Sequence, residues 1–300
     1  MDKIRQLLNP REVDMVLYHA NCHDGFGAAW VANTILGPNA QYIGISYQSK
    51  SDFDPRGRNI VLLDFSFDLA TCQKIKSLAK NFVILDHHKT AAETLAKLDY
   101  AYFDMEKSGI TLAWEYFRSD SVPEFIKCIE THDLWKFEER KETCPHAKSF
   151  TTYWYNIVGQ NPKVDFEHYY QLYQDPSLFY IYLDEGYTLL KYIDNVIKKK
   201  ADTATDMFWH GPDARVYRAK VINTDTFISE LGNHLSNQNN VDFAALWSYN
   251  HKYHNYRISL RSNGATDVSA IAKLYGGGGH RASSGFTLFQ HPDTIFSMVD

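Results

Sequence analysis

Phe82-Val83-Ile84-Leu85-Asp86-His87-His88 (FVILDHH, residues 82–88) is the stretch that says most about the fold. An apolar run followed at once by polar residues is typical of a buried strand that delivers polar side chains to the edge of a sheet. Taken alone, Asp86-His87-His88 has a second interpretation, because an Asp can cap a following turn while neighbouring histidines are simply exposed. The surrounding sequence is needed to choose between the two.

Upstream of this stretch, short apolar runs alternate with amphipathic stretches, a pattern that predicts βαβ units and a parallel sheet. We expect strands at 14–18, 41–46, 59–63 and 82–85, and helices at 25–36 and 68–80. Ligands of such sheets bind beyond the carboxyl ends of the strands. His19 to Asp24 follow the first strand, Asp64 the third and Asp86-His87-His88 the fourth, so we expect these side chains to meet at one edge.

The rest of the chain predicts a helical connector and a second domain. Helical patterns extend from 109 to about 200, and alternation resumes with strands expected at 214–222, 243–249 and 256–260, helices at 227–236 and 268–275, and a final strand after the glycines. The predicted fold class is α/β, with a parallel-sheet domain and connector over 1–205 and a smaller α/β domain over 206–300. The boundary is placed within 202–211, and the active site is expected in the cleft between the domains.

Composition narrows the class of protein. The 300 residues carry a net charge of -5, which disfavours binding of long duplex nucleic acid but leaves local binding of a small anion open. Four separated cysteines without a CxxC pair, together with the absence of a secretory signal pattern, indicate a reduced, cytoplasmic protein. No apolar run is long enough for a membrane span. Whether the chain forms a homodimer stays open.

The carboxylates expected at the sheet edge indicate a metal site. Asp24 and Asp64, brought near the pair His87-His88, would repel one another and raise each other's pKa unless a cation offset their charge. Oxygen ligands with one imidazole suit Mn²⁺ or Mg²⁺ better than a thiolate-rich zinc site does. A bridging carboxylate could hold two such ions about 3.5 to 4 Å apart for displacement at phosphorus.

A second motif, Gly276-Gly277-Gly278-Gly279-His280-Arg281, indicates an anion site. Consecutive glycines let the backbone approach a ligand closely, and exposed amides in such segments bind anions. His280 and Arg281 add donors suited to phosphate oxygens. A flexible hinge is the alternative interpretation, but a hinge requires neither the His-Arg pair nor the small residues that follow it.

The motifs, taken in order, resemble those of the DHH phosphoesterases with the DHH-associated C-terminal domain, a family that includes nanoRNases, pAp phosphatases and RecJ-like proteins. The resemblance spans nearly the whole chain, and 104–109 and 259–262 also match family spacings. The motifs that carry it are Asn21-Cys22-His23-Asp24-Gly25, Leu63-Asp64-Phe65-Ser66, Asp86-His87-His88, Asp133-Leu134-Trp135, and Gly276 to His280 with Ala282 and Gly285.

The resemblance implies a role for each matched residue. Asp24, Asp64, His87 and Asp133 would bind one metal ion, with Asp64 bridging to a second. His88 would face the scissile phosphate, and Asp86 would orient its neighbours. The substrate-binding residues would be Arg261, Gly277, Gly278, Gly279, His280 and Arg281.

The sequence departs from the family pattern at the second metal ion. Where family members commonly supply an Asp two residues before the position of Asp24, this chain has Cys22. His19, Asn21 and His23 are nearby alternatives, although each has a loop-structuring role as an equal explanation. We expect His19 first and Cys22 next as ligands of this ion, at a site that is weaker or selective for a softer ion. Trp135 is interpreted first as core packing and second as a platform for a nucleobase.

The resemblance implies metal-assisted hydrolysis of phosphodiester or phosphomonoester bonds in short oligonucleotides or nucleotides, with Mn²⁺ or Mg²⁺ as cofactor. A single-strand exonuclease and a hydrolase of polyphosphate or pyrophosphate are the competing enzymes. A nucleotide sensor without catalytic activity is the competing binding protein, and Cys22 is the residue that suggests it.

Overall fold

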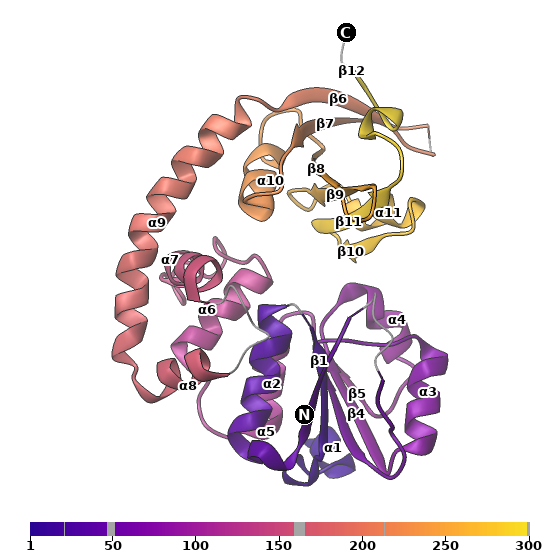
Figure 1. Ribbon diagram of the computed structural model, residues 1–300, viewed down its shortest axis with the longest axis vertical. Coiled ribbons are helices and arrows are strands. Elements are labelled where there is room, and N and C mark those ends of the chain that lie inside the picture. Colours follow the sequence, from indigo (N-terminus) through magenta and orange to yellow (C-terminus); the bar gives the residue numbers. More distant parts are fainter. Residues whose placement is uncertain (21, 47–51, 159–165, 213, 299–300) are drawn as a thin grey trace. The chain divides into compact units, whose positions relative to one another are not determined.

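The computed structural model describes residues 1–20, 22–46, 52–158, 166–212 and 214–298. The chain divides into two compact units, unit 1 (Met1–Leu190) and unit 2 (Lys191–Asp300). The α/β class is confirmed, because unit 1 contains a parallel five-stranded sheet and unit 2 a separate seven-stranded sheet with its own helices (Figure 1). The division falls inside helix α9 (Ser177–Ala201), and the domain boundary expected at 205/206 stays a prediction.

The sheet of unit 1 has the order β2-β1-β3-β4-β5, and all its strand pairs are parallel. Its strands are β1 (Met15–His19), β2 (Gln41–Ile45), β3 (Asn59–Leu63), β4 (Asn81–Asp86) and β5 (Ala101–Phe103). Successive residues of β3 point to opposite faces, with Val61 and Leu63 in one core and Ile60 and Leu62 in the other. A strand buried on both faces requires a continuous apolar run, which is why β3 and β4 were predictable. The short strand β5 was not foreseen.

Helices cover both faces of this sheet (Figure 1). On one side α2 (His23–Leu36) and α5 (Gly109–Phe117) pack together around the buried rings of Trp30 and Trp114, and α3 (Leu69–Leu78) and α4 (Ala92–Leu95) lie on the other. The remaining helical elements of the unit are α1 (Asp2–Leu7), α6 (Glu124–Asp133), α7 (Ala147–Tyr153), α8 (Glu167–Gln174), the short turns η1 (Pro10–Glu12), η2 (Gly37–Asn39) and η3 (Lys89–Ala91), and a π-helical turn, η4 (Trp154–Val158).

Unit 2 is built on a sheet of order β10-β11-β9-β8-β7-β6-β12, in which only the described pair β7–β8 is parallel. Its elements are β6 (Thr205–His210), β7 (Val216–Asn223), α10 (Ile228–Ser236), β8 (Phe243–Asn250), β9 (Asn255–Arg261), α11 (Val268–Leu274), β10 (Gly278–His280), β11 (Ser283–Leu288), η5 (Pro292–Thr294) and β12 (Phe296–Met298). Neither β6 nor β12 is among the strands expected from the sequence, and no strand was expected at 278–280. The pairing of these segments depends on neighbouring strands rather than on their own pattern.

None of the helices in the described ranges is both long enough and apolar enough to cross a membrane.

Candidate metal centre

Three neighbouring parallel strands end at the same edge of the unit 1 sheet and place polar side chains there. β1 ends with His19, β3 is followed directly by Asp64, and β4 ends with Asp86, after which come His87 and His88. Asp64 adopts a left-handed backbone with φ of 56°. That conformation is uncommon outside glycine and is found preferentially at functional sites. The structure thus brings together the side chains that the strand order predicted.

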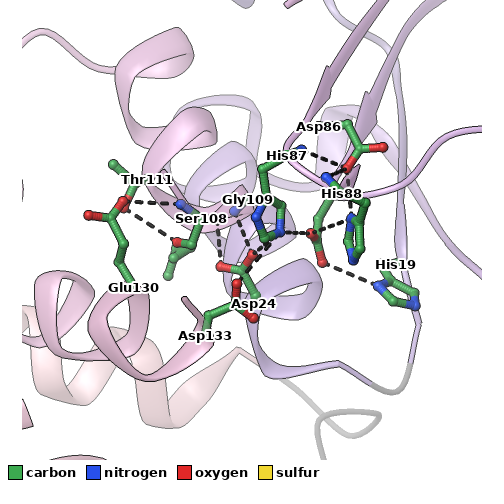
Figure 2. A network of polar contacts seen from close by, with 12 residues as sticks. His19, Asp24, Asp86, His87, His88, Ser108, Gly109, Thr111, Glu130 and Asp133 are labelled. Carbon is green, nitrogen blue, oxygen red and sulfur yellow. Dashed lines mark hydrogen bonds and ion pairs between the residues drawn. The ribbon is translucent and has the colours of Figure 1, made fainter. Parts of the chain in front are cut away.

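Three carboxylates lie close to Nε2 of His87, and Figure 2 labels two of them, Asp24 and Asp133. His87 Nε2 lies 3.0 Å from Asp64 Oδ1, 3.6 Å from Asp24 Oδ2 and 3.6 Å from Asp133 Oδ2. The side chains of Asp24, Asp64 and His87 are at most 2% exposed, whereas that of Asp133 is 23% exposed, so the site opens to solvent on the side of Asp133. Asp133 is the last residue of α6, and Asp24 lies in the first turn of α2.

The buried carboxylates raise one another's pKa, whereas the histidines beside them lower the pKa of Asp64. Burial, followed by the charges of Asp133 and Asp64, raises the pKa of Asp24 well above its usual value. Burial also raises the pKa of Asp133. Burial alone would raise the pKa of Asp64 too, but hydrogen bonds from His19 and His87 hold it below the usual range. Burial lowers the pKa of His87, yet its bond to Asp64 and the surrounding carboxylates raise that pKa to about 10. Without a bound cation, His87 is therefore protonated, and its positive charge offsets part of the negative charge of the carboxylates.

This set of donors fits a divalent cation. Ligand atoms of Asp24, His87 and Asp133 lie within 4.8 Å of one another, and so do those of Asp64, His87 and His88. Carboxylate oxygens with imidazole nitrogens are ligands for Mn²⁺, Mg²⁺ or Zn²⁺. A cation among them would offset the repulsion that raises the pKa of Asp24 and Asp133. The residues that would hold such an ion are therefore Asp24, Asp64, His87 and Asp133.

The N-terminus of α5 fixes the carboxylate of Asp24. The amide of Gly109 donates to Asp24 Oδ2, and the amide of Ile110 donates to Oδ1 at 2.8 Å. A Cβ on Gly109 would lie 2.4 Å from the Cβ of Asp64, so only glycine leaves room for both carboxylates here. In the sequence, 104–109 stands out only as a family spacing, and these amide donors were not expected from it. The sole sequence signal was a glycine at the start of a helix.

A second layer of hydrogen bonds supports α5 (Figure 2). The carboxylate of Glu130 accepts from the amide of Ser108 at 3.1 Å and from the guanidinium of Arg140. Ser108 precedes the first residue of α5, and the Ser108 hydroxyl lies 3.5 Å from that of Thr111. Because Glu130 lies on α6 and binds Ser108 at the start of α5, it joins α6, which ends in Asp133, to α5, whose amides bind the carboxylate of Asp24. No motif in the sequence pointed to Glu130.

Asp86 orients the two histidines that follow it. Its Oδ1 accepts from the amide of His87 at 2.7 Å, the amide of His88 at 3.1 Å and His88 Nδ1 at 2.7 Å, while Oδ2 accepts from the hydroxyl of Ser66. Burial lowers the pKa of His88, but the bond to Asp86 raises it to about 9. With Nδ1 held by Asp86, Nε2 is the ring nitrogen that can meet a substrate atom.

His19 and Cys22 form a further group with Asp64. Their ligand atoms lie within 4.8 Å of one another, and His19 Nδ1 is 3.3 Å from Asp64 Oδ2. Burial, then the charges of Asp64, Asp133 and Asp24, raises the pKa of the Cys22 thiol well above its usual value. The ring of His23 packs instead against Tyr155, 4.3 Å away between centroids. Asn21, the remaining alternative, lies outside the described residues.

Aromatic side chains lie beside Asp133. Trp135 has a left-handed backbone with φ of 54°, at the position after the end of α6 where glycine is usual. Its ring is half-buried and contacts the rings of His132 and Phe137, with centroids 5.5 Å and 5.2 Å away. Phe137 packs against the core of unit 1, whereas Trp135 is not part of the hydrophobic clusters of the described residues. The interpretation of Trp135 as core packing is therefore not supported.

The candidate substrate-binding residues all belong to unit 2. Strand register aligns Arg261 of β9, Ser283 of β11 and His280 of β10, so these three side chains share one face of the sheet. The guanidinium of Arg261 donates to Ser229 Oγ at 3.1 Å and to the carbonyl of Leu260 at 2.9 Å. Strand pairing, rather than a loop, thus places Arg261 and His280 on the same face, with Ser283 of β11 between them.

In the segment 276–279, some positions require glycine for backbone conformation or space, and one does not. Gly276 and Gly279 have positive φ, and a Cβ on Gly277 would lie 2.1 Å from the carbonyl of Gly285. A Cβ on Gly278, in contrast, would meet nothing within 4 Å, so the fold of the described residues does not itself require glycine there. Arg281 donates to the carbonyls of residues 264 and 265 at 2.8 Å and 3.2 Å, so part of its donor capacity stabilises that turn.

Comparison with known proteins gives two sequence matches that cover 93% of the chain. Residues 216–295 match the model of the DHHA1 domain. Over 93% of the chain, the sequence is 32% identical to an uncharacterized protein, R106, of Acanthamoeba polyphaga mimivirus, and the match covers 68% of that protein. It is also 24% identical to the oligoribonuclease NrnB of Bacillus subtilis, over 93% of this chain and 74% of that protein.

Among solved structures, an exopolyphosphatase-related protein from Bacteroides fragilis shares the fold. The superposition has a TM-score of 0.51 and covers 98% of this chain and 93% of that one, at 13% sequence identity. At this identity the match concerns the architecture alone.

Proposed function

The chain belongs to the DHH family and carries a DHHA1 domain, and from this premise we propose that it hydrolyses phosphoester bonds of short oligonucleotides or nucleotides with the help of divalent cations. The observation that carries the proposal is the convergence of three carboxylates on His87, which follows β4: Asp64 directly after β3, Asp24 in the first turn of α2 and Asp133 at the end of α6. Mn²⁺ or Mg²⁺ are the proposed ions, with two sites of unequal affinity.

The proposed sites differ in their donors. Asp24, Asp64, His87 and Asp133 would hold the first ion, whereas His19 and Cys22 with Asp64 would hold the second. When bound, the ions would activate a water molecule and offset charge on the phosphoryl oxygens. A neutral thiol is a poor ligand for a hard cation, so the second site should be the weaker one. Asp64 is common to both groups, which is the basis for assigning it the bridging position.

The protein's own groups would position substrate and move a proton. Asp86 holds Nδ1 of His88, so that Nε2 can donate a proton to the departing oxygen of the ester. Because the pKa of His88 is raised to about 9, its imidazole is protonated at neutral pH and can supply that proton. The α5 amides keep the carboxylate of Asp24 in one orientation, which lowers the cost of assembling the site. In unit 2, Arg261, His280, Arg281 and the amides of Gly277, Gly278 and Gly279 are proposed to bind phosphate or base.

Short nucleic acids are the favoured substrates for two reasons. The name of the Bacillus relative refers to an oligoribonuclease, and the net charge of -5 lacks the overall positive field that long nucleic acid favours. A nucleotide sensor without catalysis is the second candidate, favoured by one observation: Cys22 occupies a ligand position with a thiol whose pKa is raised. Turnover in the presence of Mn²⁺ separates the two.

The test replaces the shared carboxylate. Asp64→Asn keeps the size of the side chain but removes its charge, and we expect hydrolysis of a dinucleotide to fall by more than about 100-fold, because substitutions of groups that only support metal ligands already cost up to that much. Initial rates with saturating Mn²⁺ and calorimetric titration of the ion are the measurements. Asp68→Asn, four residues on at the exposed N-cap of α3, is the matched control and should keep full activity.

A panel of pAp, linear and cyclic dinucleotides, longer single strands and polyphosphate identifies the substrate. Wild-type turnover of Asp64→Asn would contradict the metal assignment. Binding of nucleotide by the wild-type chain without any turnover would support the sensor, and preference for polyphosphate would overturn the proposed substrate class.

A further inference from the structure

Two cysteines that the proposed reaction does not use lie in contact inside unit 1. Cys128 belongs to α6 and Cys144 to the segment before α7, and their Sγ atoms are 3.3 Å apart. Both are free thiols, the first fully buried and the second 5% exposed. A disulfide has an S–S distance of about 2.0 Å, so the two sulfur atoms need to approach by roughly 1.3 Å to bond.

The two thiols differ in access. Cys144 lines a cavity of about 440 Å³ together with Lys127, Thr131, Arg140 and other residues of α5, α6 and the segment before α7. Cys128 does not line this cavity. A small reagent that enters the cavity therefore meets Cys144 first.

The two thiols also differ in acidity. The hydrogen bond between them lowers the pKa of Cys144 and raises that of Cys128. The thiolate is the nucleophilic form of cysteine, so Cys144 is the sulfur atom better prepared to attack an oxidant. Access and acidity point to the same residue.

We propose that Cys128 and Cys144 form a redox-active dithiol that a peroxide converts reversibly to a disulfide. The Cys144 thiolate attacks one peroxide oxygen, the O–O bond breaks, and the released oxygen takes up a proton, which leaves a sulfenic acid on Cys144. Cys128 then attacks that sulfur, the S–S bond forms, and the S–O bond breaks with loss of water that carries the proton of Cys128. The two sulfur atoms together lose two electrons and the peroxide gains them. A thiol reductant returns the pair to its starting state.

A metal site is the competing explanation for this pair. The carboxylate of Glu124 lies 3.8 Å from Cys144 Sγ, and the ligand atoms of all three residues are within 4.8 Å of one another. A tetrahedral zinc ion with Zn–S bonds of about 2.3 Å would hold two sulfur atoms roughly 3.8 Å apart, wider than the 3.3 Å found here. Glu124 also forms an ion pair with Lys127 at 3.4 Å. The geometry therefore favours direct sulfur chemistry.

Mass spectrometry of the full chain tests the proposal. The reduced protein, freed of reductant, is treated with one equivalent of hydrogen peroxide, alkylated under denaturing conditions and digested with trypsin. We expect a linked pair of peptides, 128–136 and 142–148, with two of the four thiols lost to alkylation and regained after dithiothreitol. The oxidised protein should also melt several degrees higher, because the disulfide closes a loop within unit 1.

Single substitutions test the separate roles of the two cysteines. Cys128→Ser should stop at a sulfenic acid on Cys144 that dimedone traps, whereas Cys144→Ser should leave Cys128 unoxidised. Cys72→Ser is the matched control, because Cys72 is another buried thiol and should not affect the linkage. Absence of the linked peptides, or faster oxidation of Cys22 or Cys72, overturns the proposal. So does a Zn²⁺ stoichiometry that falls by one in both Cys128→Ser and Cys144→Ser, since that result assigns the pair to a metal.

Discussion

At the scale of single residues, Cys22 is the position that departs from the family pattern. It is the N-cap of α2, and its Sγ lies in the group with His19 and Asp64. Burial, then the carboxylates of Asp64, Asp133 and Asp24, raises the pKa of the thiol. A carboxylate at this position would therefore face two opposing effects, favourable capping of α2 and repulsion by its neighbours.

We predict that Cys22→Asp tightens the weaker cation site for Mn²⁺ or Mg²⁺, because a carboxylate suits these ions better than a thiol does. Without metal, capping of α2 by the new carboxylate would add about 1 kcal/mol to the free energy of unfolding. Repulsion by the neighbouring carboxylates should cancel or exceed that gain. Calorimetric titration of Mn²⁺, with melting temperature followed alongside, measures both effects. A variant that melts lower even with saturating Mn²⁺, and gains no occupancy, would show that residue 22 serves only packing. Cys22→Ser controls for loss of the thiol.

Trp135 is the second residue with an unusual local conformation. A left-handed backbone costs an ordinary residue about 1–2 kcal/mol, yet a tryptophan stands here two residues after Asp133 and outside the hydrophobic clusters of the described chain. If the substrate is a nucleotide, as proposed, we expect this ring to stack against a nucleobase.

We predict that Trp135→Gly keeps the free energy of unfolding within about 1 kcal/mol of the wild type, because the relieved backbone offsets the lost ring contacts. Binding of a dinucleotide should weaken by about 1–3 kcal/mol, the range found for base stacking on aromatic side chains. Urea denaturation and binding measurements test the two halves separately. Trp135→Phe, which keeps a ring, should retain most of the affinity. Equal dinucleotide affinity in wild type and glycine variant would refute the stacking role.

At the scale of elements, β6 shows how pairing with a neighbouring strand stabilises a strand that its own sequence pattern does not predict. Register places Asp206 opposite Lys220 of β7, and Lys220 Nζ donates to Asp206 Oδ2 at 2.9 Å. Arg218 Nε lies 3.4 Å from Asp206 Oδ1. These contacts, the bond to Lys220 first, lower the pKa of Asp206. The carboxylate thus joins β6 to its neighbour in a pH-dependent way.

We predict that Asp206→Asn lowers the free energy of unfolding at pH 7 by about 0.2–1 kcal/mol, the range for cross-strand charge pairs. Because the folded pKa lies below the unfolded value of about 3.9, this contribution is present above pH 4 and disappears as the pH falls through the folded pKa. Urea denaturation of both proteins from pH 7 down to pH 2.5 should show the difference shrinking. The exposed Asp225→Asn is the control. A difference that grows with acidity would contradict the sign.

At the scale of the whole molecule, the candidate residues divide between the two units. Every candidate metal ligand lies before residue 134, in unit 1, and every candidate substrate-binding residue lies in unit 2. Such a division implies that each function can be impaired without the other. The proposal that the active site lies between the domains stays a prediction.

We predict that His280→Ala lowers kcat/KM for a dinucleotide by roughly 10- to 150-fold, equivalent to the loss of about 1.5–3 kcal/mol from a charged hydrogen bond to phosphate. The number of Mn²⁺ ions bound should not change. Initial-rate kinetics and metal analysis of the same samples provide the two readouts. His210→Ala, an exposed histidine on β6, is the matched control. Loss of metal from His280→Ala would contradict the division of labour.

The sequence by itself determined the parallel sheet of unit 1 and the edge at which its polar residues gather. Apolar runs such as 59–63 and 82–85 report burial on both faces, and strand direction then fixes where His19, Asp64 and Asp86 emerge. The expected grouping of Asp24, Asp64 and His87 and the separation of α/β units follow from the same local patterns, whereas Asp133 was expected only from the family resemblance. The segment before α5, the π-helical turn and β6 carry no comparable local signal.

Only the tertiary structure decided which distant residues meet. The amides of Gly109 and Ile110 hold Asp24 across more than 80 residues of chain, the ring of His23 turns to Tyr155 rather than to Asp64, and Cys128 touches Cys144. A repeating pattern is contained in neighbouring residues and can be read directly from the sequence. Contacts between distant residues, in contrast, depend on how helices pack over the sheet, because each partner's position is set by side chains that lie elsewhere in the chain.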